Sequence, residues 1–341
     1  ESGMMAIAAT IKDVAKYTGL STATISKYIN GVRVKEKNRK LIEEAIEKLD
    51  FRVNEIARGL KTNRTMTVGV LIPSLENIFF TSIVSHIERV LQEHGYSTIL
   101  CDYNQNCSLE NSKFDFLMNK SVDGIILIPL GIDKERIKKA LEREVPVILV
   151  DRLLKGLECD VILVDNLNAS YDTVEQLIIK GHKRVGIICG PQNLYTAEER
   201  LRGYIRVHED YNMPVDQALT RMGENEIQGG YNGIKELLEL ENPPTAVFAT
   251  NYEMTVGAIM ALNERNVRIP EDISFIGFDN LQLAKVVKPN FHVVVQPIRQ
   301  IGETTANLLL RRLKKDYGNY PSISRLKTKL VSGYSIADIT V

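Results

Sequence analysis

The sequence predicts an α/β fold in which two doubly wound parallel-sheet lobes follow a small all-α module. The chain has 341 residues, 44% of them hydrophobic, and a single hydrophobic core rarely grows past about 250–300 residues. Residues 10–50 carry apolar side chains at helical spacing and no plausible strand. From about Met66, short apolar runs alternate with amphipathic helices, which is typical of a parallel sheet covered on both faces.

Three short helices are expected in the first module. The motif TIKD places Asp13 three residues after Thr10, as in a capping box, so a helix should begin here and run to about Tyr17. Apolar spacing predicts a second helix over 22–28 and a third over 36–49.

The first two helices have the spacing of a helix-turn-helix. Such a pair needs a small residue where the axes approach, a residue that tolerates positive φ in the turn, and an apolar plug. Ala15, Gly19 and Ile25 supply these in order, and Ser21 can cap the second helix. An ordinary helical hairpin is the alternative.

Charge separates the module from the body. Residues 1–65 hold 13 Lys and Arg against 8 Asp and Glu, although the whole chain has a formal net charge of zero. A basic module on an acidic body indicates a polyanionic partner for the N-terminal end.

Eight apolar runs in the body predict buried strands. They alternate with helical stretches, and eight such strands suggest two sheets rather than one. The runs are TVGVLIP (67–73), STILCD (97–102), GIILIP (124–129), VPVILVD (145–151), VILVDN (161–166), RVGIICG (184–190), TAVFATN (245–251) and ISFIGFD (273–279).

A linker joins module and body. Residues 54–61 could form one helix, but Gly59 and the short length make it unstable alone. It is either a flexible linker or a helix that folds on a partner.

Sequence motifs along the whole chain occur in one characteristic order. They are TIKDVAKYTGLSTATISKYING (10–31), NEIARGLKTNRT (54–65), IFF (78–80), VDGIILIP (122–129), KGHKRVGIICGP (180–191), PTAVFATN (244–251), PEDISFIGFDN (270–280) and VVQP (294–297). This series resembles the lactose-repressor/galactose-repressor (LacI/GalR) family of bacterial transcriptional regulators. The resemblance implies a helix-turn-helix domain (1–53), a hinge helix or linker (54–65) and a periplasmic-binding-protein-like effector and dimerisation domain (66–341), with an N-lobe at about 66–165 and 296–325 and a C-lobe at about 166–295 and 326–341.

The resemblance also implies how DNA is bound. The second helix enters the major groove, and hinge residues approach the minor groove, where a leucine wedges between base steps. Lys27 stands where the family usually has arginine; it cannot form a bidentate fork to guanine, so a shifted or relaxed base preference is expected. The DNA-binding candidates are Thr10, Thr22, Ala23, Thr24, Ser26, Lys27, Asn30, Ala57, Arg58 and Leu60.

A ligand site is expected beyond the carboxyl ends of the strands, between the lobes. Polar residues stand at five strand ends, and each could bind a ligand or cap the following helix. These are Asp102, Asp151, Asp165, Asn251 and Asp279.

Family resemblance selects among these residues and adds others. Relatives line their effector cleft at matching positions, with an aromatic pair against the ligand, although either phenylalanine could belong to the core. The candidates are Phe79, Phe80, Asp151, Thr196, Arg200, Asn251, Tyr252 and Asp279. Tyr252 replaces a usual aspartate, residues 291–296 replace a threonine-rich turn, and Gly333 replaces a common arginine.

These observations imply a homodimeric regulator, a repressor, that binds a pseudo-palindromic operator and needs no cofactor or metal. A sugar is the first expectation for the effector, with a sugar phosphate or nucleobase as alternatives and a phosphorylated carrier protein as another possible controller. A solute-binding transport protein is a further alternative, but no signal-peptide pattern is present, so a cytoplasmic location is expected. No CxxC, GxGxxG, P-loop, GxSxG or HExxH motif occurs, so catalysis is not expected.

Overall fold

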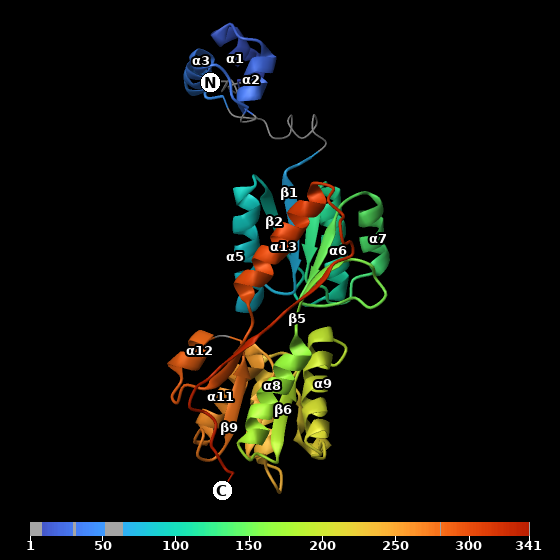
Figure 1. The fold of residues 1–341 in the computed structure, drawn as a ribbon, viewed down its shortest axis with the longest axis vertical. Helices are drawn as coiled ribbons and strands as arrows, with labels where there is room; N and C mark the ends of the chain where they lie inside the picture. The colour runs from blue at the N-terminus through green and yellow to red at the C-terminus, as the bar shows by residue number, and fades with distance from the viewer. Residues whose placement is uncertain (1–8, 30–31, 52–63, 280, 341) are drawn as a thin grey trace, which may run out of the picture. The chain divides into compact units, whose positions relative to one another are not determined.

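The protein divides into two compact units, Glu1–Thr65 and Met66–Val341. The computed structural model describes residues 9–29, 32–51, 64–279 and 281–340. Figure 1 draws the elements of both units.

Three helices form the first unit around a small apolar core. They are α1 (Ile11–Thr18), α2 (Thr22–Ile29) and α3 (Glu36–Lys48). The sequence predictions for all three are confirmed to within one residue at each end. The fully buried side chains between them are Val14, Ile25, Ile42 and Ala45.

The caps and turn of this unit also match the sequence pattern. The Asp13 carboxylate accepts hydrogen bonds from the Thr10 backbone N–H at 2.8 Å and the Thr10 hydroxyl at 2.6 Å, and these bonds lower the pKa of Asp13. The Thr24 N–H donates to the Ser21 hydroxyl at 3.2 Å. Gly19 ends α1 with φ of +67°, the left-handed region that a side chain would disfavour.

The first lobe of the second unit contains a six-stranded sheet in the order β11-β5-β4-β3-β1-β2, parallel throughout. Its strands are β1 (Thr67–Ile72), β2 (Ser97–Asp102), β3 (Gly124–Leu127), β4 (Val147–Val150), β5 (Asp160–Val164) and β11 (Ile323–Leu326). One face packs on α5 (Ile78–Glu93) and α13 (Ile298–Leu313), the other on α6 (Cys107–Asn119) and α7 (Lys134–Glu142).

The second lobe repeats the architecture with strand order β12-β10-β9-β8-β6-β7, in which β12 alone is antiparallel to its neighbour. Its strands are β6 (Val185–Cys189), β7 (Thr220–Met222), β8 (Ala246–Ala249), β9 (Ser274–Phe278), β10 (His292–Val295) and β12 (Lys329–Val331). One face packs on α8 (Asn166–Ile179) and α9 (Tyr195–Asp210). The other packs on α10 (Ile227–Leu238), α11 (Tyr252–Glu264) and α12 (Leu281–Val286), and a short 3-10 helix η1 (Gln217–Leu219) precedes β7.

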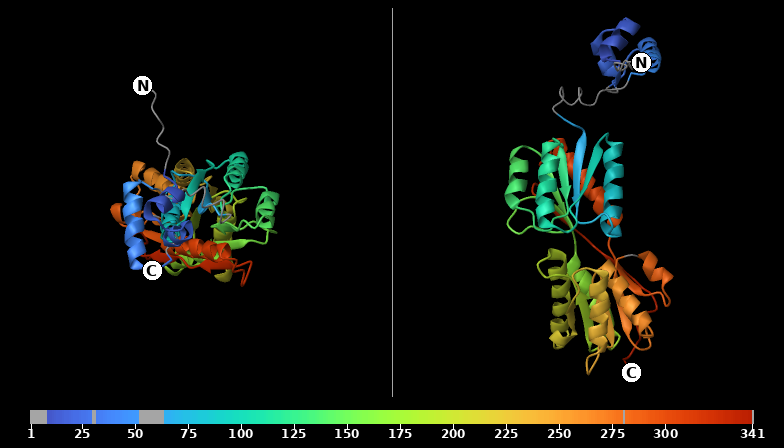
Figure 2. Two further views of the ribbon diagram at one scale, coloured as in Figure 1. Left: turned by 90° about the horizontal axis from the view of Figure 1, so that it is seen from above. Right: turned by 180° about the vertical axis from the view of Figure 1, so that it is seen from behind.

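Three chain segments join the two lobes of this unit. They lie between β5 and α8 at Asp165, between β10 and α13 at residues 296–297, and between β11 and β12 at residues 327–328. The red segment that carries β11 and β12 can be followed from one lobe to the other in Figures 1 and 2. Because β5 and β10 each end at a crossing, the carboxyl ends of both sheets meet at the junction of the lobes.

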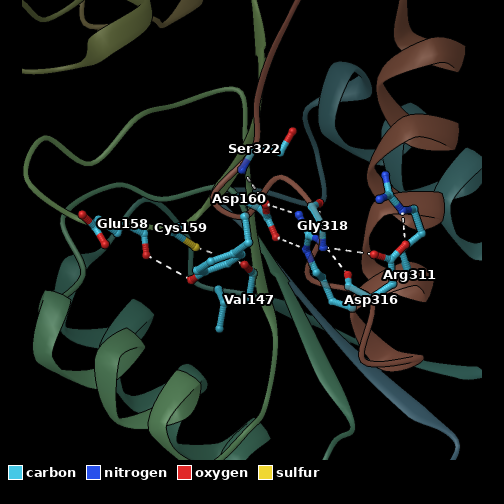
Figure 3. Close-up of polar contacts among 10 residues, drawn as sticks. Val147, Glu158, Cys159, Asp160, Arg311, Asp316, Gly318 and Ser322 are labelled. Carbon is cyan, nitrogen blue, oxygen red and sulfur yellow. Dashed lines mark hydrogen bonds and ion pairs between the residues drawn. The ribbon is translucent and has the colours of Figure 1, made fainter.

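A buried ion pair joins the start of β5 to the last turn of α13 in the first lobe. The Arg312 guanidinium donates to both Asp160 carboxylate oxygens, at 2.7 and 2.9 Å, and both side chains are 1% exposed. The Ser322 N–H completes the Asp160 shell at 2.8 Å. Tyr317 and Tyr320 place their rings 5.6 and 5.4 Å from the Arg312 guanidinium carbon. Figure 3 shows how this network ties the first residue of β5 to the end of α13.

All eight predicted strands are present, and the two-lobed parallel-sheet prediction is confirmed. Four strands were missed, namely β7, β10, β11 and β12, of which β12 departs from the parallel prediction. The predicted hinge helix over 54–61 lies outside the described residues.

Candidate functional site

A cleft of about 470 Å³ lies between the lobes of the second unit, at the carboxyl ends of their strands. All eight predicted effector residues line it, which brings together side chains up to 200 positions apart in the sequence. They are Phe79, Phe80, Asp151, Thr196, Arg200, Asn251, Tyr252 and Asp279. Their binding roles stay predictions.

Phe79 and Phe80 form an apolar wall. Asn77 caps α5 by accepting a hydrogen bond from the Phe79 N–H at 2.9 Å, which fixes the first turn of the helix at the cleft. The two rings meet edge to face with centroids 5.4 Å apart. Both side chains belong to the buried core of the lobe and also line the cleft, so the core interpretation is confirmed and their contact with a ligand stays a prediction.

Asp151 is a buried acid with an unused acceptor. Its backbone has φ of +68°, which turns the chain just after β4 and places the carboxylate in the cleft lining. Oδ1 has no hydrogen-bond partner among the described residues, and the nearest cation is the Arg152 Nε, 3.5 Å from Oδ2. Burial raises the pKa of Asp151.

Asp279 occupies the equivalent position in the other lobe. It follows β9 with φ of +63° and is 8% exposed. The Gln296 amide donates to both carboxylate oxygens, at 2.9 and 3.1 Å, and Gln296 Oε1 is buried without a partner among the described residues. Burial raises the pKa of Asp279 to about 6, against opposing effects of Arg200 and Gln296.

Arg200 is held rigidly beneath the cleft. Its Nε donates to Asn166 Oδ1 at 2.8 Å and its Nη1 to the Thr250 carbonyl at 2.5 Å, while its guanidinium carbon lies 3.8 Å from the centroid of the Phe278 ring. Burial lowers the pKa of Arg200, and Asp279 and Asp151 oppose that shift. The charge therefore stays fixed between the two acids.

A hydrogen bond spans the cleft from one lobe to the other. The Asn77 amide donates to Glu253 Oε1 at 2.5 Å. Asn251 caps α11 by accepting from the Met254 N–H at 2.8 Å, and it also donates to Asn225 at 3.2 Å. Burial raises the pKa of Glu253. The Asn77–Glu253 hydrogen bond thus links the two lobes directly at the cleft lining.

Tyr252 and Thr196 complete the predicted set. Tyr252, half-buried, begins α11. Thr196 is buried in the first turn of α9.

Two of the five polar residues at strand ends have structural roles instead. Asp102 accepts hydrogen bonds from the Leu75 and Asn104 N–H groups, at 3.1 and 2.6 Å. Asp165 caps α8 by accepting from the Asn168 N–H at 3.3 Å. Neither lines the cleft. The capping interpretation is confirmed for Asp165, whereas Asp102 binds loop N–H groups and Asn106 caps the helix that follows it.

Sequence reasoning missed several lining residues. They come from loops or lie beside a predicted residue, and they include Glu76, Asn77, Gln105, Arg152, Asn225, Glu226, Glu253 and Gln296. Two of them could have been found from the sequence by their position: Gln296 lies in the VVQP motif, and Arg152 directly follows Asp151. With them the lining holds five carboxylates, Glu76, Asp151, Glu226, Glu253 and Asp279, against the two arginines.

The helix-turn-helix candidates lie mainly on one helix. Thr22, Ala23 and Lys27 are exposed on α2. The Thr10 hydroxyl serves the α1 cap, and the Thr24 hydroxyl lies 3.0 Å from that of Ser21. Ser26 is half-buried. The other candidates, Asn30, Ala57, Arg58 and Leu60, lie outside the described residues.

The described part of the chain contains neither a cluster of metal ligands nor a membrane-spanning helix. No three His, Cys, Asp or Glu side chains are grouped to hold a metal ion. No described helix is both long enough and apolar enough to span a membrane.

Two family models match this chain. "Bacterial regulatory proteins, lacI family" matches residues 10–54, and "Periplasmic binding proteins and sugar binding domain of LacI family" matches residues 65–325. Catabolite control protein A of Priestia megaterium is 33% identical over 309 residues, covering 90% of this chain and 93% of that protein.

Solved structures agree with these matches. A transcriptional regulator CelR–cellobiose complex is 27% identical with a TM-score of 0.73, covering 96% of this chain and 99% of that chain. The Lac repressor dimer bound to operator and the anti-inducer ONPF has a TM-score of 0.86 at 23% identity, covering 97% of this chain and 100% of that chain, which supports the fold.

Proposed function

Because the chain belongs to the LacI family and is a DNA-binding transcriptional repressor with an effector-binding domain, we propose that its effector is a neutral sugar. The observation that carries this proposal is a pair of buried acceptors on side chains that line the cleft, Asp151 Oδ1 and Gln296 Oε1, which lack partners among the described residues. A buried acceptor without a partner is unfavourable, and sugar hydroxyls are donors that can satisfy it. The cellobiose complex of the similar CelR protein supports the same ligand class.

The charge of the cleft favours an uncharged ligand over a phosphorylated one. Five carboxylates line it against two arginines, one of which is already bonded to Asn166 and Thr250. Bringing a phosphate dianion into this surplus of negative charge is unfavourable, because the low dielectric of a cleft strengthens the repulsion.

Calorimetric titration of the full-length protein tests the ligand class. Glucose, galactose, ribose, fructose and cellobiose would be compared with glucose 6-phosphate, fructose 6-phosphate and hypoxanthine. At least one neutral sugar is expected to bind at least tenfold more tightly than any phosphorylated sugar. Tighter binding of a phosphorylated sugar or of hypoxanthine would contradict the proposal. No detectable binding of any sugar would also contradict it and would favour a phosphorylated carrier protein as the controller.

We propose that the protein acts as a homodimer on a pseudo-palindromic operator. Apolar side chains stand exposed on the second unit at Leu100, Met260 and Val286, which are 38%, 52% and 77% exposed. Pairing with a second copy would remove apolar area of this kind from solvent. Light scattering after size exclusion would show a dimer, and a monomer or tetramer would contradict it.

Lys27 gives a testable specificity. It is exposed on α2, where its point charge cannot fork to guanine. In a series of single base substitutions measured by fluorescence anisotropy, Lys27→Arg is expected to add about 1–3 kcal/mol of guanine preference at one operator position. Lys16→Arg, on α1, serves as the matched control and should add none. A wild-type protein that already requires guanine sharply there would contradict this expectation.

Control of DNA binding would follow from lobe closure. An effector that contacts both Asp151 and Asp279 binds the two lobes at once, and the Asn77–Glu253 bond already spans them. A ligand shifts such an equilibrium only by its differential affinity for the two states. We infer that sugar binding changes the lobe arrangement and with it the operator affinity.

A further inference from the structure

A second chamber opens between the same two lobes beside the effector cleft. It measures about 510 Å³ and shares Gln105, Asn225 and Glu226 with the cleft, so the two cavities adjoin at these residues. We propose that this chamber is a subsite for a second sugar ring, and that the effector is a neutral disaccharide. This inference rests on the proposed sugar effector and specifies that it has two sugar rings.

The walls of the second chamber are preorganised on both sides. Asn104 and Gln105 from the first lobe have φ of +47° and +51°, and Glu224 and Asn225 from the second lobe have φ of +50° and +60°. Non-glycine residues adopt this region infrequently, and such conformations concentrate at ligand sites. Two strained pairs facing one chamber from different lobes are therefore an indication of a binding surface.

Asn225 lines both chambers, and its side chain packs beside Gly190. A Cβ at position 190 would meet the end of the Asn225 side chain, so Gly190 leaves room for the carboxamide in its present position. The Asn225 side-chain oxygen accepts the Asn251 amide at 3.2 Å. The carboxamide is thus held where one sugar ring would meet the next.

The opposite wall is fixed from below by a buried acid. Glu110 is fully buried, and its two carboxylate oxygens accept hydrogen bonds from the Leu130 and Gly131 N–H groups at 2.8 and 2.9 Å. These bonds hold the loop after β3, which contributes Leu130 to the chamber lining.

The chemistry of the lining suits an uncharged ring. Leu130, Pro191 and Leu194 offer an apolar surface for the C–H face of a pyranose, while carboxamides from both lobes can bond its hydroxyl rim. No Lys or Arg is among the described residues that line this chamber. A neutral second sugar therefore fits better than an anionic group.

The volumes support a two-ring ligand. Each chamber falls within the range of about 300–1,000 Å³ found for small-molecule sites, at about 470 and 510 Å³. A monosaccharide held by Asp151 and Asp279 would leave the second chamber to solvent.

Calorimetry with matched sugar pairs on the full-length protein tests this subsite. The pairs are glucose with cellobiose, glucose with maltose, and galactose with lactose. We expect one disaccharide to bind at least tenfold more tightly than its monosaccharide. Asn193→Trp, which fills the second chamber, is expected to bring that ratio close to one. Asn119→Trp, an equally exposed asparagine at the end of α6 outside both chambers, is the control and should keep the ratio.

Each outcome decides the inference. A tenfold ratio that collapses in Asn193→Trp alone supports the subsite, with the melting temperature of the variant showing that it folds. Wild-type ratios within twofold would overturn the subsite while leaving the sugar effector in place. A tenfold ratio unchanged in Asn193→Trp would overturn the location. Absence of binding by every sugar would overturn the sugar effector and the subsite together.

Discussion

Replacing Arg312 with methionine is expected to lower the free energy of unfolding by about 3–5 kcal/mol, because breaking a buried ion pair leaves an uncompensated charge. Arg312 is the cation of the Asp160 pair, both side chains are 1% exposed, and two tyrosine rings cover the guanidinium. The variant would leave the Asp160 carboxylate with only the Ser322 N–H as a hydrogen-bond donor. The loss should appear in urea denaturation followed by circular dichroism at pH 7.

Arg311→Met is the matched control for this prediction. Arg311 is the preceding residue and pairs with Asp316 at 2.9 Å, but the side chains of both Arg311 and Asp316 are about half exposed. Such exposed pairs contribute at most about 1 kcal/mol. The double variant Asp160→Leu/Arg312→Met should recover much of the stability lost in Arg312→Met. Equal losses in the two arginine variants would contradict the account of the buried pair.

Replacing Asp279 with asparagine is expected to weaken effector binding and stabilise the free protein. Charged hydrogen bonds contribute about 1.5–3 kcal/mol each, so the affinity for the sugar should fall roughly ten- to a hundredfold. Asp165→Asn is the control, since that acid caps α8 outside the cleft and asparagine caps equally well. An unchanged sugar affinity in Asp279→Asn would refute the binding role.

The stability effect follows from the sign of the Asp279 pKa shift. Burial raises the pKa from 3.8 to about 6, so the folded state binds more protons than the unfolded state between these values. The wild type therefore loses stability as pH rises from about 4 to 6, by roughly 3 kcal/mol at most. Asp279→Asn removes this loss, and its gain in melting temperature should be larger at pH 7.5 than at pH 5. A gain that does not vary with pH would contradict this cause.

The sequence predicts the fold well where strands are buried on both faces. Runs such as VILV and GIIL contain no polar residue to obscure the pattern, and all eight predicted runs are strands. The missed strands are short, and three of them, β7, β11 and β12, lie at sheet edges with polar or half-exposed residues. An edge strand pairs with a neighbouring strand on one side only. Its residues therefore need not all be apolar, as they are in strands buried on both faces.

The candidate site could be predicted in part. Strand-end position found Asp151 and Asp279, but it could not separate them from Asp102 and Asp165. The difference is conformational: the first two adopt positive φ and line the cleft, whereas Asp102 and Asp165 accept local backbone hydrogen bonds. Glu253 and Asn77 were missed because their role depends on the approach of two lobes, which local sequence does not encode.

Operator binding with and without sugar tests the central claim most directly. Fluorescence anisotropy of the full-length protein would be measured on an operator selected from random duplexes, at zero and saturating concentration of the sugar that binds best. The account predicts at least a fivefold change in operator Kd and an equal change in sugar Kd on adding operator. In Asp279→Asn the same change in operator Kd should need a roughly ten- to a hundredfold higher sugar concentration. An operator Kd that is the same with and without sugar would contradict it.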